Sequence, residues 1–456
     1  MKRFAALFLA LLAISPLAWA KTEKVRSTKL PNGLQVQEYR MENGMQVLLV
    51  QDHSAPVFTY QVWFKVGSAT EKMDPKLQKT GLAHLFEHMM FRGTPTVPDG
   101  MFTKKMSAAG EVGLNASTWL DRTNYFESLP KEQLELAFQL ESDRMANLAI
   151  DDKLFKTELG AVFGERKMRA DKPSSIANDA LWELSYDKHP YKWTTMGTAA
   201  ELNSFTVDEA NYFYRTYYAP NNATLILIGD FETAKALRLA EKYYGKFKAQ
   251  EIPRREPPVE PAQTEARKKE VTHPLATSDL LMIGYHIPDC RHSDMPALQV
   301  LGAVLSTGNG SIMEQELVQE GIASSVGAGA YNLRYPGMFQ FSINMVQGKS
   351  ADKAVKILKD ALARIAKGEL SAAELERGRN QYLLSAYSDL GGQSSIGQYL
   401  GEALVSSDNY LNEFEILQAT KKVTIADLQR VVKTYFKDEN SNFIHLKPGA
   451  DKGDAQ

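Results

Sequence analysis

One segment of the chain occurs twice, and this repeat limits the possible folds more than any other feature of the sequence. Residues 206–218 recur as residues 424–436, and each copy is followed by an Asn-containing turn and an apolar strand. The matched pairs are Thr206 and Thr424, Thr216 and Thr434, Tyr217 and Tyr435, and Asn222 and Asn440. Because helix, turn and strand follow in the same order at the end of each half, the repeat indicates a duplicated chain with two related domains.

The linker between the two domains is predicted at residues 250–269, a stretch rich in Pro, Glu and Arg with almost no apolar residues. Such a composition is typical of a spacer between folded units, and it predicts that the units can swing together over a substrate. The predicted organisation is an N-terminal domain at 21–249, the linker, a C-terminal domain at 270–448 and a tail at 449–456.

The first twenty residues have the three zones of a secretory signal peptide. Lys2 and Arg3 precede an almost wholly apolar run at 4–17, and Ala18-Trp19-Ala20 supplies a small-x-small cleavage site. We therefore expect a mature chain from Lys21 and an exported protein, periplasmic or secreted. The apolar run is too short and too soon followed by polar sequence for a membrane span, so an uncleaved anchor is the weaker alternative.

Charge and cysteine content exclude some classes of partner and bond. The chain has 53 basic and 55 acidic side chains, a formal net charge of -2, which gives no basic surface for nucleic acid or for a polybasic membrane contact. The single Cys290 cannot form an internal disulfide. We expect it to be a small core residue.

Residues 81–91 contain two histidines and a glutamate with the spacing of a metal site. His84, Glu87 and His88 read as H-x-x-E-H. On a helix, His84 and His88 project from one face and can share one tetrahedral cation, while Glu87 on an adjoining face can reach a metal-bound water as general base. The alternative is a partly buried helix with two polar residues. A third ligand decides between them.

A second predicted helix, from Asp152 to about Met168, carries two candidates for that third ligand. Glu158 and Glu165 are seven residues apart, so they lie on one stripe about 10 Å apart along the axis. Only one of them can bind a given metal directly, and local reasoning leaves the choice open. The corresponding helix of the second half, at 296–306, contains no histidine. Only the N-terminal half can therefore hold the metal.

With these residues identified, the chain resembles the pitrilysin or insulinase family of zinc metallopeptidases, which includes the mitochondrial processing peptidases, over nearly its whole mature length. In that family the inverted motif is followed after seventy-six residues by a glutamate ligand, and counting residues 89–164 from His88 leads to Glu165. The resemblance implies His84, His88 and Glu165 as ligands of one Zn²⁺ per chain, Glu87 as catalytic base and Glu158 as a support of the ligands. It also implies an α+β fold of two tandem α/β rolls, each an antiparallel sheet with helices packed on one side.

The resemblance further implies where a substrate binds. Asn115 and Ala116 match the family's edge-strand segment that pairs with the substrate backbone, although an ordinary hairpin would look the same. Members often place an arginine and a tyrosine of the second half toward the metal. Here Arg334 is present, but Phe341 stands where the tyrosine is expected, so Tyr335 or Tyr331 is the candidate.

The predicted function is an exported zinc endopeptidase that acts on peptides or unfolded segments. The alternative, from a different class, is a non-catalytic peptide-binding or assembly subunit, which the complete motif disfavours. A small-molecule hydrolase would be favoured only without the duplicated half. Full-length members of the resembled family have four roll domains and this chain supplies two, so we expect a homodimer or a heterodimer with a sister subunit.

Overall fold

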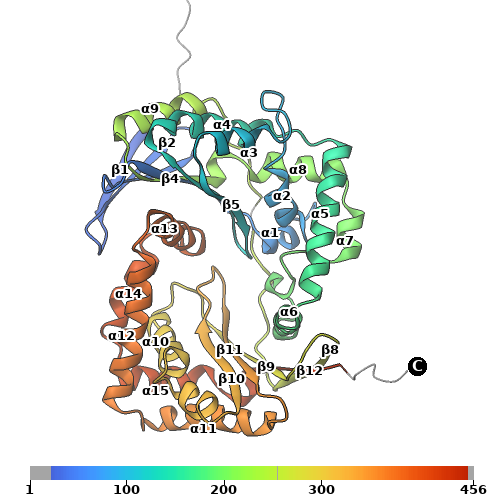
Figure 1. The fold of residues 1–456 in the computed structure, drawn as a ribbon, viewed down its shortest axis with the longest axis vertical. Helices are drawn as coiled ribbons and strands as arrows, with labels where there is room; N and C mark the ends of the chain where they lie inside the picture. The colour runs from blue at the N-terminus through green and yellow to red at the C-terminus, as the bar shows by residue number, and fades with distance from the viewer. Residues whose placement is uncertain (1–21, 254, 450–456) are drawn as a thin grey trace, which may run out of the picture.

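The computed structural model describes residues 22–253 and 255–449. The predicted signal peptide, 1–20, lies outside the described residues, as does all of the predicted tail except Gly449. Two α+β units follow one another along the chain, and each is built on one sheet (Figure 1). This confirms the predicted fold class of two tandem domains. No helix among the described residues is long and apolar enough to cross a bilayer.

The first sheet has seven strands within the described residues, in the order β1-β2-β3-β7-β4-β6-β5. Only β3 and β7 run parallel; the other neighbours are antiparallel. The strands are β1 (Thr22–Lys29), β2 (Gln35–Met41), β3 (Gln46–Gln51), β4 (Val57–Phe64), β5 (Val112–Thr118), β6 (Thr123–Pro130) and β7 (Ala223–Gly229). The β5 strand therefore lies at an edge of the sheet.

The helices of the first half connect and cover these strands. They are α1 (Ser68–Met73), α2 (Leu82–Met89), α3 (Met101–Ala108), α4 (Leu134–Asn147), α5 (Asp152–Ala170), α6 (Pro173–Ser185), α7 (Ala199–Ser204), α8 (Val207–Tyr217) and α9 (Thr233–Tyr244).

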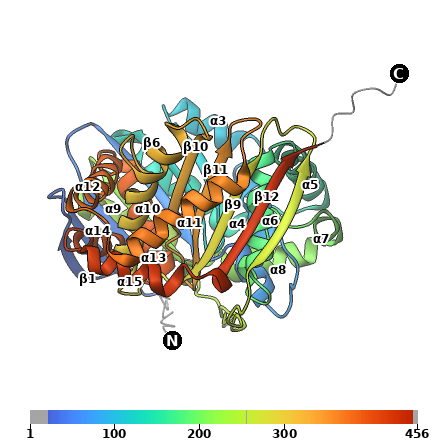
Figure 2. The ribbon, with the colours of Figure 1, turned by 90° about the horizontal axis from the view of Figure 1, so that it is seen from below.

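The second sheet has five strands within the described residues, in the order β10-β11-β9-β12-β8, with only β12 and β8 parallel. The strands are β8 (Arg267–His273), β9 (Leu280–Ile287), β10 (Ala323–Ala330), β11 (Gly337–Met345) and β12 (Ser441–Pro448). The helices are α10 (Met295–Ser306), α11 (Ala351–Lys367), α12 (Ala372–Asp389), α13 (Gln393–Ser407), α14 (Asn412–Thr420) and α15 (Ile425–Tyr435). Figure 2 shows the strands of this sheet from below, with α11 crossing them.

The two halves exchange one helix each, which the predicted one-sided roll did not include. On β4, Tyr60 and Val62 face the core of the first half, whereas Trp63 packs with Leu400 and Leu404 of α13. In the same way α6 of the first half packs on β9 and β12 of the second sheet. Figure 1 shows α13 against the first sheet and α6 beside the second. Both sheets therefore carry helices on both faces.

Two glycines on α13 allow this close approach. A Cβ atom at Gly397 would collide with the Gln61 side chain, and one at Gly401 would collide with the Trp63 indole. Trp63 is fully buried and donates from Nε1 to Gln61 Oε1 over 2.9 Å. The exchanged helix is thus fitted to the strand through small residues and one large aromatic side chain.

The repeated segment makes the same hydrogen bonds in both halves. Tyr217 donates from its hydroxyl to Asp74 Oδ2 over 2.6 Å, and Tyr435 does so to Asp294 Oδ2 over 2.7 Å. Asn222 Nδ2 donates to the Tyr217 carbonyl over 2.8 Å, and the equivalent bond of the second half is 2.7 Å long. Both helices also begin with a Thr capping box. These shared contacts agree with the duplication inferred from the sequence.

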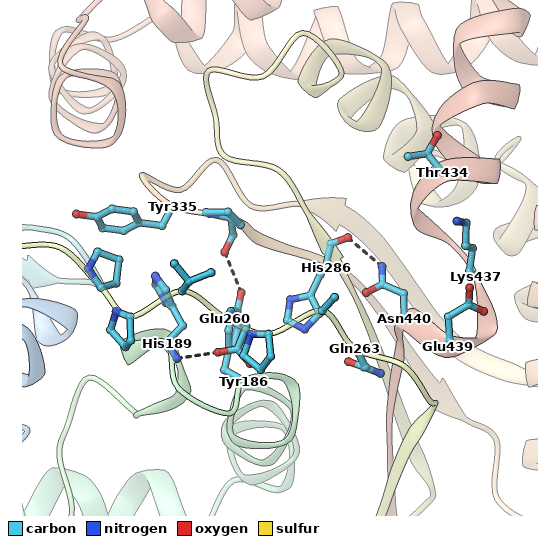
Figure 3. Close-up of a pocket in the computed structure, with 16 residues that line it drawn as sticks. Tyr186, His189, Glu260, Gln263, His286, Tyr335, Thr434, Lys437, Glu439 and Asn440 are labelled. Atoms are coloured by element: carbon cyan, nitrogen blue, oxygen red, sulfur yellow. Dashed lines mark hydrogen bonds between the residues drawn. The ribbon is translucent and has the colours of Figure 1, made fainter.

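The predicted linker is docked onto both halves, unlike a free spacer. On the second half, Gln263 Nε2 donates to the Ser441 carbonyl over 3.0 Å. The Glu260 carboxylate accepts the backbone N–H groups of Asp187, Lys188 and His189 over 2.6, 2.9 and 2.7 Å, and Figure 3 shows the last of these bonds. Arg255 donates to the Lys65 carbonyl and to Thr70 Oγ1. The end of the predicted linker also belongs to β8.

The single cysteine is a core residue, as predicted. Cys290 is 1% exposed and donates from Sγ to the Ser406 carbonyl over 3.4 Å. Burial raises the pKa of its thiol to about 12, so the thiol stays protonated and unreactive at neutral pH.

Candidate metal centre

The helix α2 begins at a glycine and buries an apolar stripe. Gly81 precedes it with φ 112°, a left-handed conformation that favours glycine. Leu82, Leu85, Phe86 and Met89 follow at helical spacing and are fully buried. This stripe anchors the helix in the core of the first half, and the two histidines project from another face.

A buried glutamate holds the beginning of this helix. Glu71 accepts the backbone N–H groups of Gly81 and Ala83, each over 2.5 Å. These are orphan donors at a helix N-terminus, where a carboxylate is favoured. Burial nevertheless raises the pKa of Glu71 to about 8, with a further contribution from the negative charge of Glu201. The residue fixes the position of α2 relative to α1.

The helix α5 brings the two candidate glutamates to the histidines. Asp151 begins it by accepting the N–H groups of Lys153 and Leu154 over 2.9 and 2.8 Å. Phe155 and Val162 are buried on the same side of the helix as Glu158. The packing of α5 on α2 therefore decides which glutamate meets which histidine.

His84, His88 and Glu165 converge with the geometry of metal ligands. Glu165 Oε2 lies 3.4 Å from His84 Nε2 and 3.3 Å from His88 Nε2. One ligand atom from each of the three residues lies within 4.8 Å of the other two. Zinc bonds of roughly 2.0–2.1 Å to nitrogen and oxygen would place neighbouring corners of a tetrahedron about 3.4 Å apart. Two imidazoles and one carboxylate at this separation fit a zinc ion.

Glu158 supports this set from the other side of the His88 ring. Its Oε2 lies 3.5 Å from His88 Nδ1, and its Oε1 accepts Nε of Arg92 over 2.6 Å. Glu158 is 4% exposed. A carboxylate on the ring nitrogen opposite the metal-facing one orients a ligand histidine and fixes its tautomer. The structure thus separates the two acids that local sequence reasoning could not distinguish.

The charges of the cluster favour ionised carboxylates. Interaction with His84 lowers the pKa of the Glu165 carboxyl. Burial alone would raise the pKa of Glu158, but its hydrogen bonds with His88 and Arg92 outweigh burial and lower the pKa. Hydrogen bonding to Glu158 raises the pKa of His88. Both glutamates are therefore negative at neutral pH, which is the form that attracts a cation.

Glu87 is placed beside the ligands without joining them. It is half-buried, directly precedes His88, and makes no side-chain hydrogen bond within the described part of the chain. The three metal-facing atoms belong to other residues. Its carboxylate is therefore free to exchange a proton with a molecule bound at the cluster.

The predicted substrate strand lies at the open edge of the first sheet, next to this cluster. The β5 strand pairs only with β6 among the described strands. Asn115 on this strand is exposed, whereas Ala116 is 7% exposed. Thr118 Oγ1 donates to the carbonyl of Ala83, the residue before His84, over 3.4 Å. An unpaired edge beside the candidate metal centre can accept a further extended strand.

The second-half residues named from the resemblance are not brought to the cluster. Arg334 donates to the Val405 carbonyl over 2.9 Å and pairs with Asp408 over 2.8 Å. Tyr335 donates to the Arg255 carbonyl over 3.2 Å, Tyr331 donates to Gln340 over the same distance, and Phe341 is fully buried in the second core. These side chains join the two halves or fill the second one.

Two residues of the site were missed from the sequence. Arg92 follows His84 and His88 at four-residue spacing, so its place near Glu158 could have been noticed. Glu71 had no such signal, because its contact with Gly81 depends on how α1 packs against α2. Neither residue faces the metal position: Arg92 binds Glu158, which supports His88, and Glu71 holds the start of the helix that carries both histidines.

Comparisons with known proteins agree with this geometry. The family described as "Insulinase (Peptidase family M16)" matches residues 46–199, and the one described as "Peptidase M16 inactive domain" matches residues 204–382. The zinc protease PqqE of Helicobacter pylori is 30% identical, with 93% of each chain covered. A probable mitochondrial-processing peptidase subunit beta of Arabidopsis thaliana is 22% identical over 91% of this chain and 78% of its own length. The crystal structure of a protease from Helicobacter pylori superposes with a TM-score of 0.84 at 28% identity, covering 94% of this chain and 100% of that chain.

Proposed function

Because the chain belongs to the insulinase family of peptidases, peptidase family M16, we propose that it is an exported zinc endopeptidase that hydrolyses peptides or unfolded polypeptide segments. The observation that carries the proposal is the convergence of His84, His88 and Glu165 beside Glu87, whose carboxylate makes no hydrogen bond within the described residues. The family match to the second half is to an inactive domain, and α10 accordingly contains no histidine.

Each residue of the centre has a separate task in this proposal. His84, His88 and Glu165 would hold the ion, and Glu158 keeps the His88 ring oriented. Zinc, when bound, supplies Lewis acidity that polarises the peptide carbonyl and acidifies water. The Glu87 carboxylate takes the proton of the attacking water and passes it to the leaving amine. Both proton transfers use the same side chain.

The substrate would bind as an extended strand beside Asn115 and Ala116. Recognition of this kind rests mainly on backbone hydrogen bonds, so sequence preference at most positions is loose. A folded protein cannot present such a strand, which favours peptides and unfolded segments. Exposed Asn115 and the open edge of β5 support this part of the proposal.

Export and assembly belong to the same proposal. Residues 1–20 would direct the chain to the periplasm or the medium and be removed there; sequencing the N-terminus of the protein from fractionated cells tests this. The mature chain would act as a homodimer, or as a heterodimer with a sister subunit that lacks the zinc motif. One relative is, by its name, a subunit of a processing peptidase.

Metal analysis and a peptide-library digest of the purified mature chain test the function. We expect one zinc ion per chain and cleavage at internal peptide bonds that a chelator abolishes and zinc restores. The rival function, a peptide-binding subunit without activity, would bind library peptides and leave them intact. Zinc-loaded chain that cleaves no peptide, alone or with added sister subunit, would contradict the proposed activity.

A further inference from the structure

A cavity of about 430 Å³ lies where the substrate-edge strand ends. Trp119, the residue after β5, lines it from the first half, while Tyr331 and Tyr399 line it from the second. The Trp119 and Tyr331 rings are 6.4 Å apart. Since Thr118 contacts the residue before His84, this end of β5 lies close to the metal centre. A peptide that extends along β5 would therefore pass the cavity.

Among the described residues, Arg122 is the one arginine that lines the cavity, and it is already paired. Arg122 donates from Nε to Glu402 Oε1 over 2.8 Å and from Nη1 to Ser117 Oγ over 2.7 Å. The Arg122 side chain is 12% exposed. The bond to Ser117 also ties this wall of the cavity to β5. Arg122 is therefore engaged with Glu402 and Ser117 and makes no ion pair with the second acid of the cavity among the described residues.

That second acid, Glu413, has no cationic partner within the described residues. Its two oxygens accept only the Asn332 amide, over 3.1 and 2.9 Å. The amide of Asn332 is held in this orientation because its own oxygen accepts Nε2 of Gln299 over 2.9 Å. Burial, with a further contribution from the negative charge of Glu402, raises the pKa of Glu413 to about 7. A carboxylate can accept about four hydrogen bonds, so this group retains unused capacity.

A cation on a long apolar stem satisfies such a cavity. Aromatic faces attract cations, most strongly where water is excluded, and the stem of Lys or Arg packs on apolar walls. A buried carboxylate gains most from a partner that brings the opposite charge. An acidic side chain would be repelled by Glu413, and a neutral apolar one would leave it unpaired.

We propose that the cavity between Trp119, Tyr331 and Tyr399 is a specificity subsite for a Lys or Arg side chain of the peptide bound along β5. Glu413 would be the counter-ion of that side chain. This inference rests on the proposed function. Residues of an extended strand are spaced by about 3.3 Å, so the basic residue would lie a few positions from the cleaved bond. The enzyme would then have one selective position in an otherwise permissive cleft.

A binding experiment tests the subsite without relying on cleavage. Fluorescently labelled peptides carrying a single Arg are compared with the same peptides carrying citrulline, which keeps the shape and removes the charge. Their Kd values are measured on the zinc-loaded Glu87→Gln chain. We expect one position at which citrulline weakens binding roughly tenfold or more. Glu413→Gln should remove that difference.

A matched variant on the same helix serves as control. Glu415, two residues further along α14, is exposed, and among the described residues its carboxylate accepts a hydrogen bond from Asn409 alone. Glu415→Gln should keep the full difference between Arg and citrulline peptides. If Glu413→Gln does not fold, Tyr399→Leu, which removes one aromatic wall, should reduce the same difference.

Cleavage by the unaltered chain separates this inference from the proposed function. Peptides with Arg at the selective position should be cut with a kcat/KM about tenfold above that of the citrulline peptides. If no peptide is cut, the proposed function fails while the binding measurements still decide about the cavity. Equal Kd values for Arg and citrulline at every position, or a preference that survives Glu413→Gln, would overturn the subsite.

Discussion

Glu158 approaches His88 on the ring nitrogen opposite the one that faces Glu165, with 3.5 Å between Glu158 Oε2 and His88 Nδ1. His88 is thereby held between two carboxylates of one helix. The same relationship explains why two acids spaced by seven residues can serve one metal position without both binding it. Arg92 then neutralises the acid that does not face the metal.

This relationship predicts unequal effects of two conservative substitutions. Glu165→Gln removes a charged ligand and should weaken zinc binding more than Glu158→Gln does. Loss of a residue that orients a ligand, as in Glu158→Gln, costs roughly 10- to 100-fold in affinity or activity. Competition with a zinc chelator measures both. The exposed Asp152→Asn at the start of the same helix is the control and should leave affinity unchanged. A larger loss for Glu158→Gln would mean that the ligand has been assigned to the wrong glutamate.

Replacing the proposed base separates metal binding from proton transfer. Glu87→Gln should retain zinc, because Glu87 is not among the three converging ligands, and should lose at least about 100-fold in kcat. His84→Ala should lose both zinc and activity. Zinc content by mass spectrometry and peptide cleavage are measured on the same samples. An active Glu87→Gln chain would require a different base.

How much of this site the sequence predicts depends on how far apart in the chain the contacting residues lie. The His84 and His88 pair follows from helical spacing within one element, and the apolar stripe of α2 follows from the same periodicity. Glu165 could be chosen over Glu158 only through the family spacing, because the choice depends on how two helices pack. The helix exchange was not predictable from local patterns either. Its trace in β4 is that large apolar residues such as Val62 and Trp63 stand on both faces of the strand, and both faces are buried.

The close packing of α13 on β4 predicts that position 401 tolerates no side chain. Gly401→Ala places a Cβ atom against the fully buried Trp63 and should lower the free energy of unfolding by about 1–3 kcal/mol through overpacking. Gly160→Ala, on α5 with open space around it, is the matched control and should be neutral or stabilising by up to about 1 kcal/mol. Denaturant titration of both variants measures the difference. Equal stabilities would show that α13 can shift away from β4.

A buried acid of the first half predicts a pH dependence of stability. Burial, with Glu141 nearby, raises the pKa of Glu127 well above 4.5. As the pH rises above 4.5, the unfolded chain loses this proton before the folded chain does, so stability falls by up to about 1.4 kcal/mol per pH unit until the folded pKa is reached. Glu127→Gln should remove that part of the slope, whereas the exposed Glu132→Gln should keep it. Unfolding curves from pH 5 to pH 9 measure this, and parallel slopes for all three chains would refute it.

Assembly is the prediction with the widest consequences for activity. The chain supplies two α+β units, one of which carries the metal centre, and its own Arg334 is tied to Asp408 and the Val405 carbonyl. A second chain, with an arginine and a tyrosine of its own, could complete and close the site, which a lone chain leaves open.

We therefore expect a dimer by light scattering of the mature chain, or a dimer formed only with a sister subunit. Specific activity should fall as the dimer is diluted below its dissociation constant, because each monomer loses the residues that its partner contributes. An excess of Glu87→Gln chain, kept above the dissociation constant, supplies a control, since an inactive partner that still completes the site should preserve the activity of the diluted intact chain. A monomer that keeps full specific activity at nanomolar concentration would show that one chain is sufficient.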